Sequence, residues 1–152
     1  MTPGPPQLEV ELQPGLLERE AIDSVVDRLA PLFAAGNGER SGLFLASPNA
    51  GTATTLRFWA DAQTSGVALA NPELFPWCLA NAPCAALARR FRVTGPNFTW
   101  LGGDEAQHAA WLAAELALQQ RDIDVAYVID VCFATETSPG RLRAWRVHQE
   151  FV

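Results

Sequence analysis

The spacing of hydrophobic residues changes several times along the chain, and each change predicts a new element. Residues 7–13 (QLEVELQ) alternate between polar and apolar, which is typical of a strand, and we expect this strand at a sheet edge. Apolar residues over 22–33 recur at steps of three and four, which predicts an amphipathic helix bent at Pro31 and ending near Gly36. Residues 41–47 (SGLFLAS) then predict a short apolar strand.

The second part of the chain continues the alternation of helices and strands. We expect a turn and helix over 48–66, a proline-punctuated and then helical stretch over 71–91, a strand over 96–102, a helix over 104–122, a strand over 124–134 and a last strand within 137–152. The strand over 124–134 is apolar on both faces, as expected at a sheet centre. This order predicts an α/β fold with a mainly parallel sheet flanked by helices and a C-terminal antiparallel hairpin. Residues 1–7 are expected to be flexible, and 8–152 to form one domain.

Charge and composition narrow the range of partners. The chain has 17 acidic and 11 basic residues, and its net charge of -6 repels phosphate backbones and anionic membranes. We therefore expect neither nucleic acid nor a membrane as a partner. Every basic residue is arginine, which excludes a Schiff-base lysine.

Cysteine spacing gives no sign of a disulfide framework or a metal site. Cys78, Cys84 and Cys132 are odd in number and lack CxxC spacing, so we predict no metal and no cofactor. Cys84 and Cys132 stand in apolar sequence, where thiols are expected to pack rather than react. No targeting segment and no apolar window approaching 18 residues is visible, and we expect a soluble, cytoplasmic protein.

Residues 98–118 combine a strand, a Gly-Gly turn and a long apolar helix, with Asp104 at the start of the helix. The letters GGDE at 102–105 match the start of the GGDEF signature of diguanylate cyclases. Position 106 is alanine, however, a helix follows, and no lysine is available for a triphosphate. We reject the cyclase interpretation, because a four-letter match is weak evidence.

Three segments carry a more specific resemblance. They are GPNFT (95–99), AWLAAELAL (110–118) and DVAYVID (124–130), and in order and spacing they resemble the N-terminal half of the beta-ketoacyl synthases of the thiolase superfamily. The resemblance extends over roughly residues 39–131. It implies a single thiolase-like half-fold in which the first segment leads to the nucleophile turn and the second forms the buried helix.

The resemblance places the catalytic cysteine of the family at Asp104. A carboxylate cannot carry an acyl chain as a thioester, so condensing activity is not expected. The histidine-bearing C-terminal half of the family has no counterpart here, and His148 lies outside any such motif. The resemblance therefore implies a non-catalytic, chain-length-factor-like subunit in bacterial polyketide, aryl polyene or fatty-acid-type biosynthesis. An acyl carrier protein is a possible further partner.

Other interpretations of Asp104 stay open. A carboxylate at a helix start is stabilising, so Asp104 can act as the N-cap residue alone. His108 lies one turn further on, and the two residues can instead form an acid–base dyad in a small hydrolase or cyclase acting on a carrier-bound acyl chain. A third possibility is a homodimeric module that binds an acyl or aromatic ligand.

The helix over 105–120 predicts a partner subunit. Its polar residues form one narrow stripe, and most of the remaining surface is alanine and leucine, which needs cover. The stripe consists of Asp104, Gln107, His108, Trp111, Glu115 and Gln119. Because the resembled family pairs the preceding strand across a two-fold axis, we expect a homodimer, or a heterodimer with a full-length ketosynthase. Its contact should involve Phe98, Trp100 and Leu101.

Overall fold

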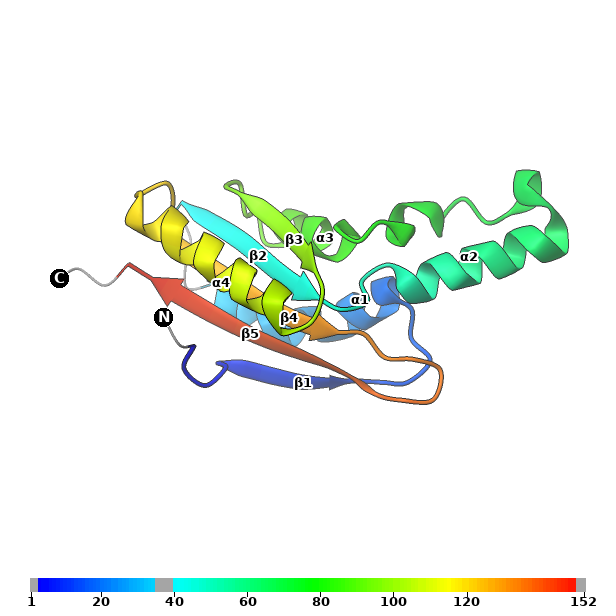
Figure 1. Ribbon diagram of the computed structural model, residues 1–152, viewed down its shortest axis with the longest axis horizontal. Helices are drawn as coiled ribbons and strands as arrows, with labels where there is room; N and C mark the ends of the chain where they lie inside the picture. The colour runs from blue at the N-terminus through cyan, green and yellow to red at the C-terminus, as the bar shows by residue number, and fades with distance from the viewer. Residues whose placement is uncertain (1–2, 35–39, 150–152) are drawn as a thin grey trace.

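The computed structural model describes residues 3–34 and 40–149, and shows one five-stranded sheet with helices on both faces (Figure 1). The predicted helix end at Gly36 lies outside the described residues. The strands are β1 (Leu8–Leu12), β2 (Ser41–Ser47), β3 (Asn97–Leu101), β4 (Val125–Cys132) and β5 (Gly140–His148). The α-helices are α1 (Glu18–Ala34), α2 (Thr52–Ser65), α3 (Ala82–Arg90) and α4 (Asp104–Gln119). There are also two short 3-10 helices in the described residues, η1 (Val67–Leu69) and η2 (Phe75–Cys78).

The strand order is β1-β5-β4-β2-β3. The strands β4, β2 and β3 run parallel to one another. The strand β5 pairs antiparallel with β4, and β1 pairs antiparallel with β5, so β1 points in the same direction as β4. The predicted α/β class with a C-terminal antiparallel hairpin is therefore confirmed. The strand expected at the centre is β4, whose residues 125–129 are all buried, and the strand expected at an edge is β1.

The two faces of the sheet are covered differently. The helices α1 and α3 lie side by side on one face, where their apolar side chains and those of the sheet form the larger core. Within this core Phe33 stacks between Phe91 and Tyr127, with ring centroids 4.1 Å and 4.0 Å away. In the described part of the chain, α4 alone covers the other face, where it packs across β2, β4 and β3.

The part of this second face beyond α4 is charged. Alternation along β1 and β5 places Glu9 opposite Arg143 and Glu11 opposite Arg141. Arg143 also forms an ion pair with Asp130 of β4, at 2.5 Å. Opposite charges on neighbouring strands suit a surface in contact with water. This half of the face therefore needs no apolar cover.

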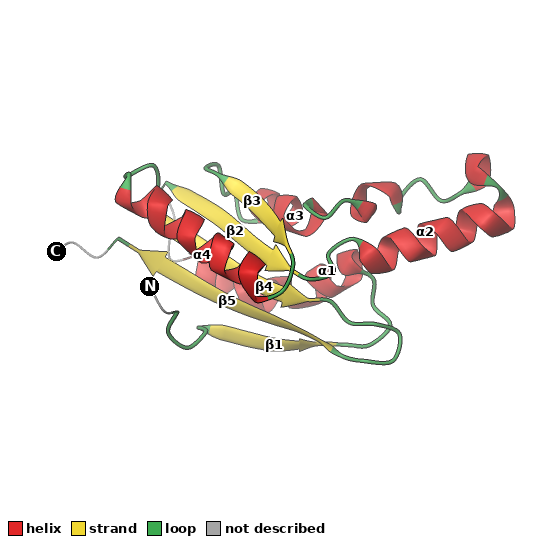
Figure 2. Cartoon of the chain, in the orientation of Figure 1, coloured by secondary structure: helices red, strands yellow, loops and turns green. Residues whose placement is uncertain are grey.

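The helix α2 projects past the end of the sheet (Figure 2). The chain returns along it through η1 and η2, and we refer to residues 52–79 as the arm. The arm has small contacts of its own, including an edge-to-face pair of Phe58 and Phe75 and a hydrogen bond from the Asn71 backbone N–H to Asp61. None of the helices within the described residues is long and apolar enough to cross a membrane.

A buried carboxylate holds the base of the arm. Glu18 of α1 is fully buried, and its two oxygens accept the backbone N–H groups of Ala53 and Thr54, at 3.0 Å each, and the hydroxyl of Thr54. It thus binds the first turn of α2, where free N–H groups and the helix dipole favour an anion. Gly51 has φ +83°, and a Cβ there would lie 2.5 Å from the carbonyl oxygen of Cys78. The start of α2 and the end of η2, which are the two ends of the arm, can therefore come this close only because residue 51 is glycine.

Candidate functional site

The turn between β3 and α4 is the candidate site that the sequence singled out. Gly102 has φ +145° and donates its N–H to the carbonyl of Ser47, which ties the turn to the end of β2. Gly103 is the N-cap residue, and Asp104 is the first residue of the helix. The interpretation of Asp104 as the N-cap is therefore wrong by one position. Its carboxylate still lies in the first turn, where the dipole favours negative charge.

The side chains of Asp104 and His108 are both exposed. No hydrogen bond or ion pair connects them within residues 3–34 and 40–149, and no group of three or more potential metal ligands occurs in that part of the chain. The acid–base dyad remains a hypothesis that mutation can test. No geometry in the described residues supports it.

The three cysteines differ sharply in their surroundings. Cys78, at the end of η2, is half-buried, and its thiol lies 3.5 Å from the carbonyl oxygen of Leu74. Cys84 is buried under β2 and β3, and its thiol points at the carbonyl oxygens of Phe98 (3.5 Å) and Leu43 (3.9 Å). Burial raises the pKa of this thiol to about 11, so it stays protonated at neutral pH. Cys132 is exposed, and its expected apolar surroundings are wrong. Strand alternation places it beside Asp130 on the charged part of the second face, where β4 extends past the start of α4 (Figure 1).

The polar stripe predicted for α4 is also partly wrong. Trp111 is only 7% exposed, because it reaches across to Trp145 of β5 and packs edge to face, with ring centroids 5.4 Å apart. The outer surface of α4 instead carries Leu112 and Leu116, which are about half exposed. The helix thus remains incompletely covered, although by different residues from those expected.

The edge strand β3 presents a second unusual surface. Phe98 and Trp100 lie on the α4 side, where both rings pack near Phe44, and Leu101 lies on the opposite side. Phe98 is 55% and Leu101 is 59% exposed. Within the described chain β3 pairs only with β2, so its outer backbone edge is open.

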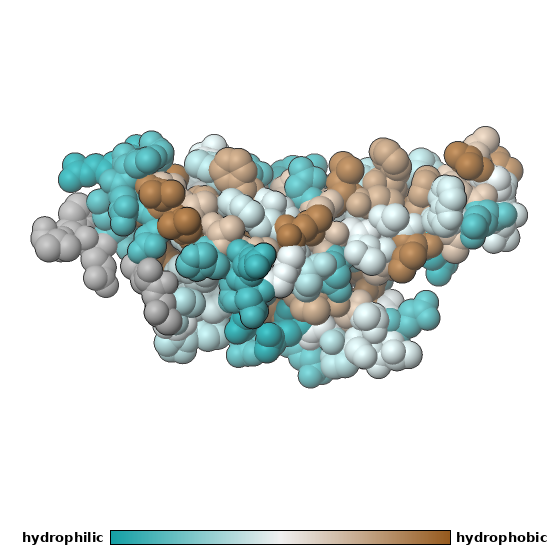
Figure 3. Space-filling view, in the orientation of Figure 1, coloured by the Kyte–Doolittle hydropathy of each residue, from teal (hydrophilic) through white to brown (hydrophobic). Residues whose placement is uncertain are grey.

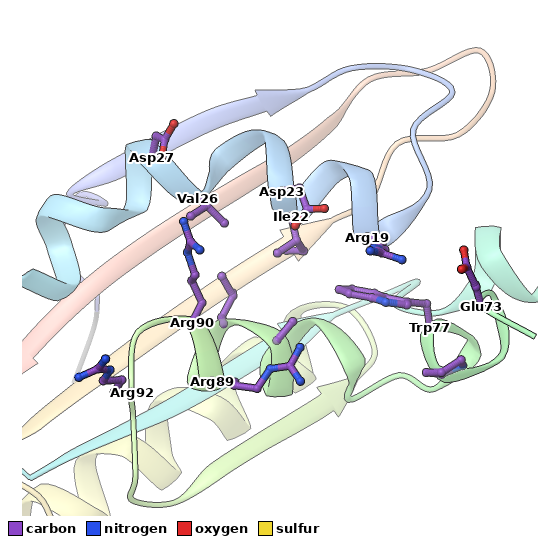
Figure 4. Close-up of a pocket in the computed structure, with 13 residues that line it drawn as sticks. Arg19, Ile22, Asp23, Val26, Asp27, Glu73, Trp77, Arg89, Arg90 and Arg92 are labelled. Carbon is purple, nitrogen blue, oxygen red and sulfur yellow. The ribbon is translucent and has the colours of Figure 1, made fainter.

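A charged groove between α1 and α3 could not be found from the sequence, because its residues come from distant segments. It has a volume of about 1000 Å³. Its charged lining residues are Arg19, Asp23, Asp27, Glu73, Arg89, Arg90 and Arg92. Figure 4 shows Arg90 extending from α3 toward α1 near Val26, with Trp77 at the other end of the groove. The lining contains no serine, cysteine or histidine, and its side chains are suited to polar and ionic contacts.

Comparison with solved structures identifies the architecture. The ishigamide ketosynthase/chain length factor matches with a TM-score of 0.63 and 17% identity, over 75% of this chain and 37% of the other. The ketosynthase in complex with its chain length factor from Xenorhabdus doucetiae matches with a TM-score of 0.60 and 12% identity, over 88% of this chain and 56% of the other. This chain has a ketosynthase-like half-fold. No protein-family model and no curated protein matches the sequence significantly.

The ketosynthase-like half-fold also matches the oxazolomycin ketosynthase domain of Streptomyces albus, with a TM-score of 0.55, 11% identity and coverage of 77% of this chain and 24% of the other. The chain thus spans between about a quarter and just over half of the three structures. At such identities the matches establish the fold. They agree with the thiolase-like architecture implied by GPNFT, AWLAAELAL and DVAYVID.

Proposed function

We propose that the protein is a non-catalytic, chain-length-factor-like subunit that pairs with a ketosynthase in bacterial polyketide, aryl polyene or fatty-acid-type biosynthesis. The observation that carries this proposal is Asp104 at the turn between β3 and α4. In the resembled family this turn presents the acyl-carrying cysteine. Here it presents an exposed carboxylate, which cannot form a thioester.

Neither Cys84 nor Cys132 replaces the missing nucleophile. Cys84 lies on the other side of β3 from α4, and its buried thiol stays protonated because its pKa is about 11. Cys132 is exposed but lies at the end of β4, opposite Arg141 of β5. We therefore assign carbon–carbon bond formation to the partner and an architectural role to this chain.

The two edges of the sheet favour β3 as the contact with the partner. Exposed sheet edges are usually protected by charge, proline or cover, because an open edge pairs with other chains. The edge strand β1 (LEVEL) carries Glu9 and Glu11, whereas β3 (NFTWL) has no charged residue and no proline. Its half-exposed Phe98 and Leu101 flank the open backbone. A strand of a second subunit can pair there and cover both side chains.

Two of the matched structures support the same choice of partner, since each combines a ketosynthase with a chain length factor. The test uses this chain, affinity-tagged, co-expressed with a ketosynthase encoded by a neighbouring gene. We expect the two to co-purify, and we expect the chain alone neither to be acylated by an acyl-carrier thioester nor to release carbon dioxide from a malonyl one. Asp104→Cys should create no condensing activity. An acyl adduct on any cysteine, formed faster than on a free thiol, would refute the proposal.

A further inference from the structure

The proposed pairing with a ketosynthase leaves the charged groove between α1 and α3 without a role. Figure 3 shows the face of the molecule that carries α4, where brown hydrophobic residues lie over α4 and along the arm. The groove lies on the opposite face, because α1 and α3 cover the other side of the sheet. Its volume of about 1000 Å³ is large enough for a small organic ligand.

Arginine is concentrated in this groove. Four of the eleven arginines of the chain line it. They are Arg19 of α1 and Arg89, Arg90 and Arg92 at the end of α3. Elsewhere Arg40 forms an ion pair with Asp124, but none of the four groove arginines has an ion pair within the described part of the chain. Their guanidinium groups are therefore available to an anion that enters the groove.

Helix stabilisation alone does not explain this arrangement. Arg89 and Arg90 lie in the last turn of α3, where the helix dipole stabilises a cation. Arg19, however, lies in the first turn of α1, where the dipole disfavours a cation. Figure 4 shows Arg90 extending across the groove toward α1. The arginines of the two helices thus face one common space.

The indole of Trp77 forms an apolar surface at one end of the groove. Figure 4 shows it between the side chains of Arg19 and Arg89. Trp77 is half-buried, since it packs against the larger core and also lines the groove. A planar or apolar group can pack on this indole, while the flanking guanidinium groups bind an attached phosphate in their bidentate geometry. The pair of arginines and the indole together favour a ligand with an anionic and an apolar part.

Carboxylates in the same groove limit the size of the anion. Asp23 and Asp27 lie one turn apart on α1, and Glu73 lies near Trp77 (Figure 4). Four arginines against three carboxylates leave little net positive charge, so a long polyanion would meet repulsion along α1. A compact phosphate monoester needs only two of the arginines.

We propose that the groove binds a small phosphate monoester, with its phosphate held by Arg19 and Arg89 and its apolar group packed on Trp77. This inference goes beyond the pairing proposed above and does not depend on it, because the groove and β3 share no residue. It gives the chain a ligand-binding role in addition to an architectural one.

Titration with phenyl phosphate, a phosphate monoester with an aromatic ring, tests the proposal. Isothermal titration calorimetry measures the affinity, and the difference between native and Trp77→Phe fluorescence isolates the signal of Trp77. At constant ionic strength we expect saturable binding, and Arg19→Gln and Arg89→Gln should each weaken it about tenfold, because charge-assisted hydrogen bonds are lost. Arg28→Gln is the matched control. Arg28 is exposed on α1 outside the groove, and removing its charge should change the affinity less than about twofold.

Two simpler anions separate the parts of the site. Inorganic phosphate should bind about fivefold more weakly than phenyl phosphate, because it lacks the ring, and tripolyphosphate should bind no more tightly than inorganic phosphate. The altered arginines are exposed, so the far-UV circular dichroism of their variants should match that of the native chain.

The proposal is overturned if phenyl phosphate shows no saturable binding at millimolar concentration. It is also overturned if Arg19→Gln and Arg89→Gln leave the affinity unchanged, or if Arg28→Gln weakens binding as much as they do. Equal affinity for phenyl phosphate and inorganic phosphate would overturn the role of Trp77. Tighter binding of tripolyphosphate would overturn the assignment of the groove to a small monoester.

Discussion

The carboxylate of Glu18 is expected to be a main source of stability, and Glu18→Gln tests this. Glu18 is fully buried and accepts three hydrogen bonds from Ala53 and Thr54 at the start of α2. The amide oxygen of glutamine can keep both bonds to Thr54, but its NH₂ group would then face the N–H of Ala53. One charge-assisted bond is lost, which is worth about 1.5–3 kcal/mol, and one buried donor loses its partner.

We therefore expect Glu18→Gln to lower the free energy of unfolding by about 2–4 kcal/mol, with a fall in melting temperature of roughly 10 °C. Urea unfolding at pH 7, followed by circular dichroism at one fixed protein concentration, measures the difference. Glu20→Gln is the matched control, since Glu20 is exposed and, among the described residues, accepts one hydrogen bond, from the N–H of Leu17 at 3.1 Å. It should cost less than about 1 kcal/mol. A loss below about 0.5 kcal/mol in Glu18→Gln would refute the reasoning.

Two further predictions concern the candidate site. Because burial raises the pKa of Cys84 to about 11, about one thiol in a thousand is ionised at pH 8, and a thiol reagent should modify Cys132 first and Cys84 only after unfolding; equal labelling rates in the native protein would contradict this. Asp104→Asn and His108→Ala should each cost under about 1 kcal/mol, because both side chains are exposed, and should leave co-purification with the ketosynthase intact. Two stable variants that both abolish biological function would instead favour the acid–base dyad.

Secondary structure and sheet topology are largely predictable because local patterns determine them. The apolar run of β4 and the alternation of β1 predict a central strand and an edge strand, and the strand order confirms both. The expected flexibility of residues 1–7 remains a prediction. The carbonyl of Gly4 accepts a hydrogen bond from the indole of Trp145, at 2.9 Å, and Gln7 bonds to the backbone of β5.

Features that depend on contacts between distant segments are not predictable from local patterns. A helical wheel places Trp111 among polar residues, and only the position of Trp145 on β5 explains why it is buried. Glu18 resembles any acidic residue at a helix start, since its partners lie more than thirty residues away. The part of the arm that contains η1 and η2 is visible in the sequence only as a proline-punctuated stretch, because short 3-10 helices have no clear periodicity. The Gly-Gly turn and Asp104 lie where the sequence predicts, with the N-cap displaced to Gly103.

The most direct test of the account is the oligomeric state of the chain, measured by sedimentation velocity at micromolar concentration. The native chain should sediment as a dimer. Trp100→Glu should dissociate or unfold it, and Phe98→Glu, at a more exposed position on the same strand, should give a folded monomer. A well-folded native monomer, or a Phe98→Glu or Trp100→Glu variant that still sediments as the native dimer, would contradict the assignment of β3 as the subunit contact.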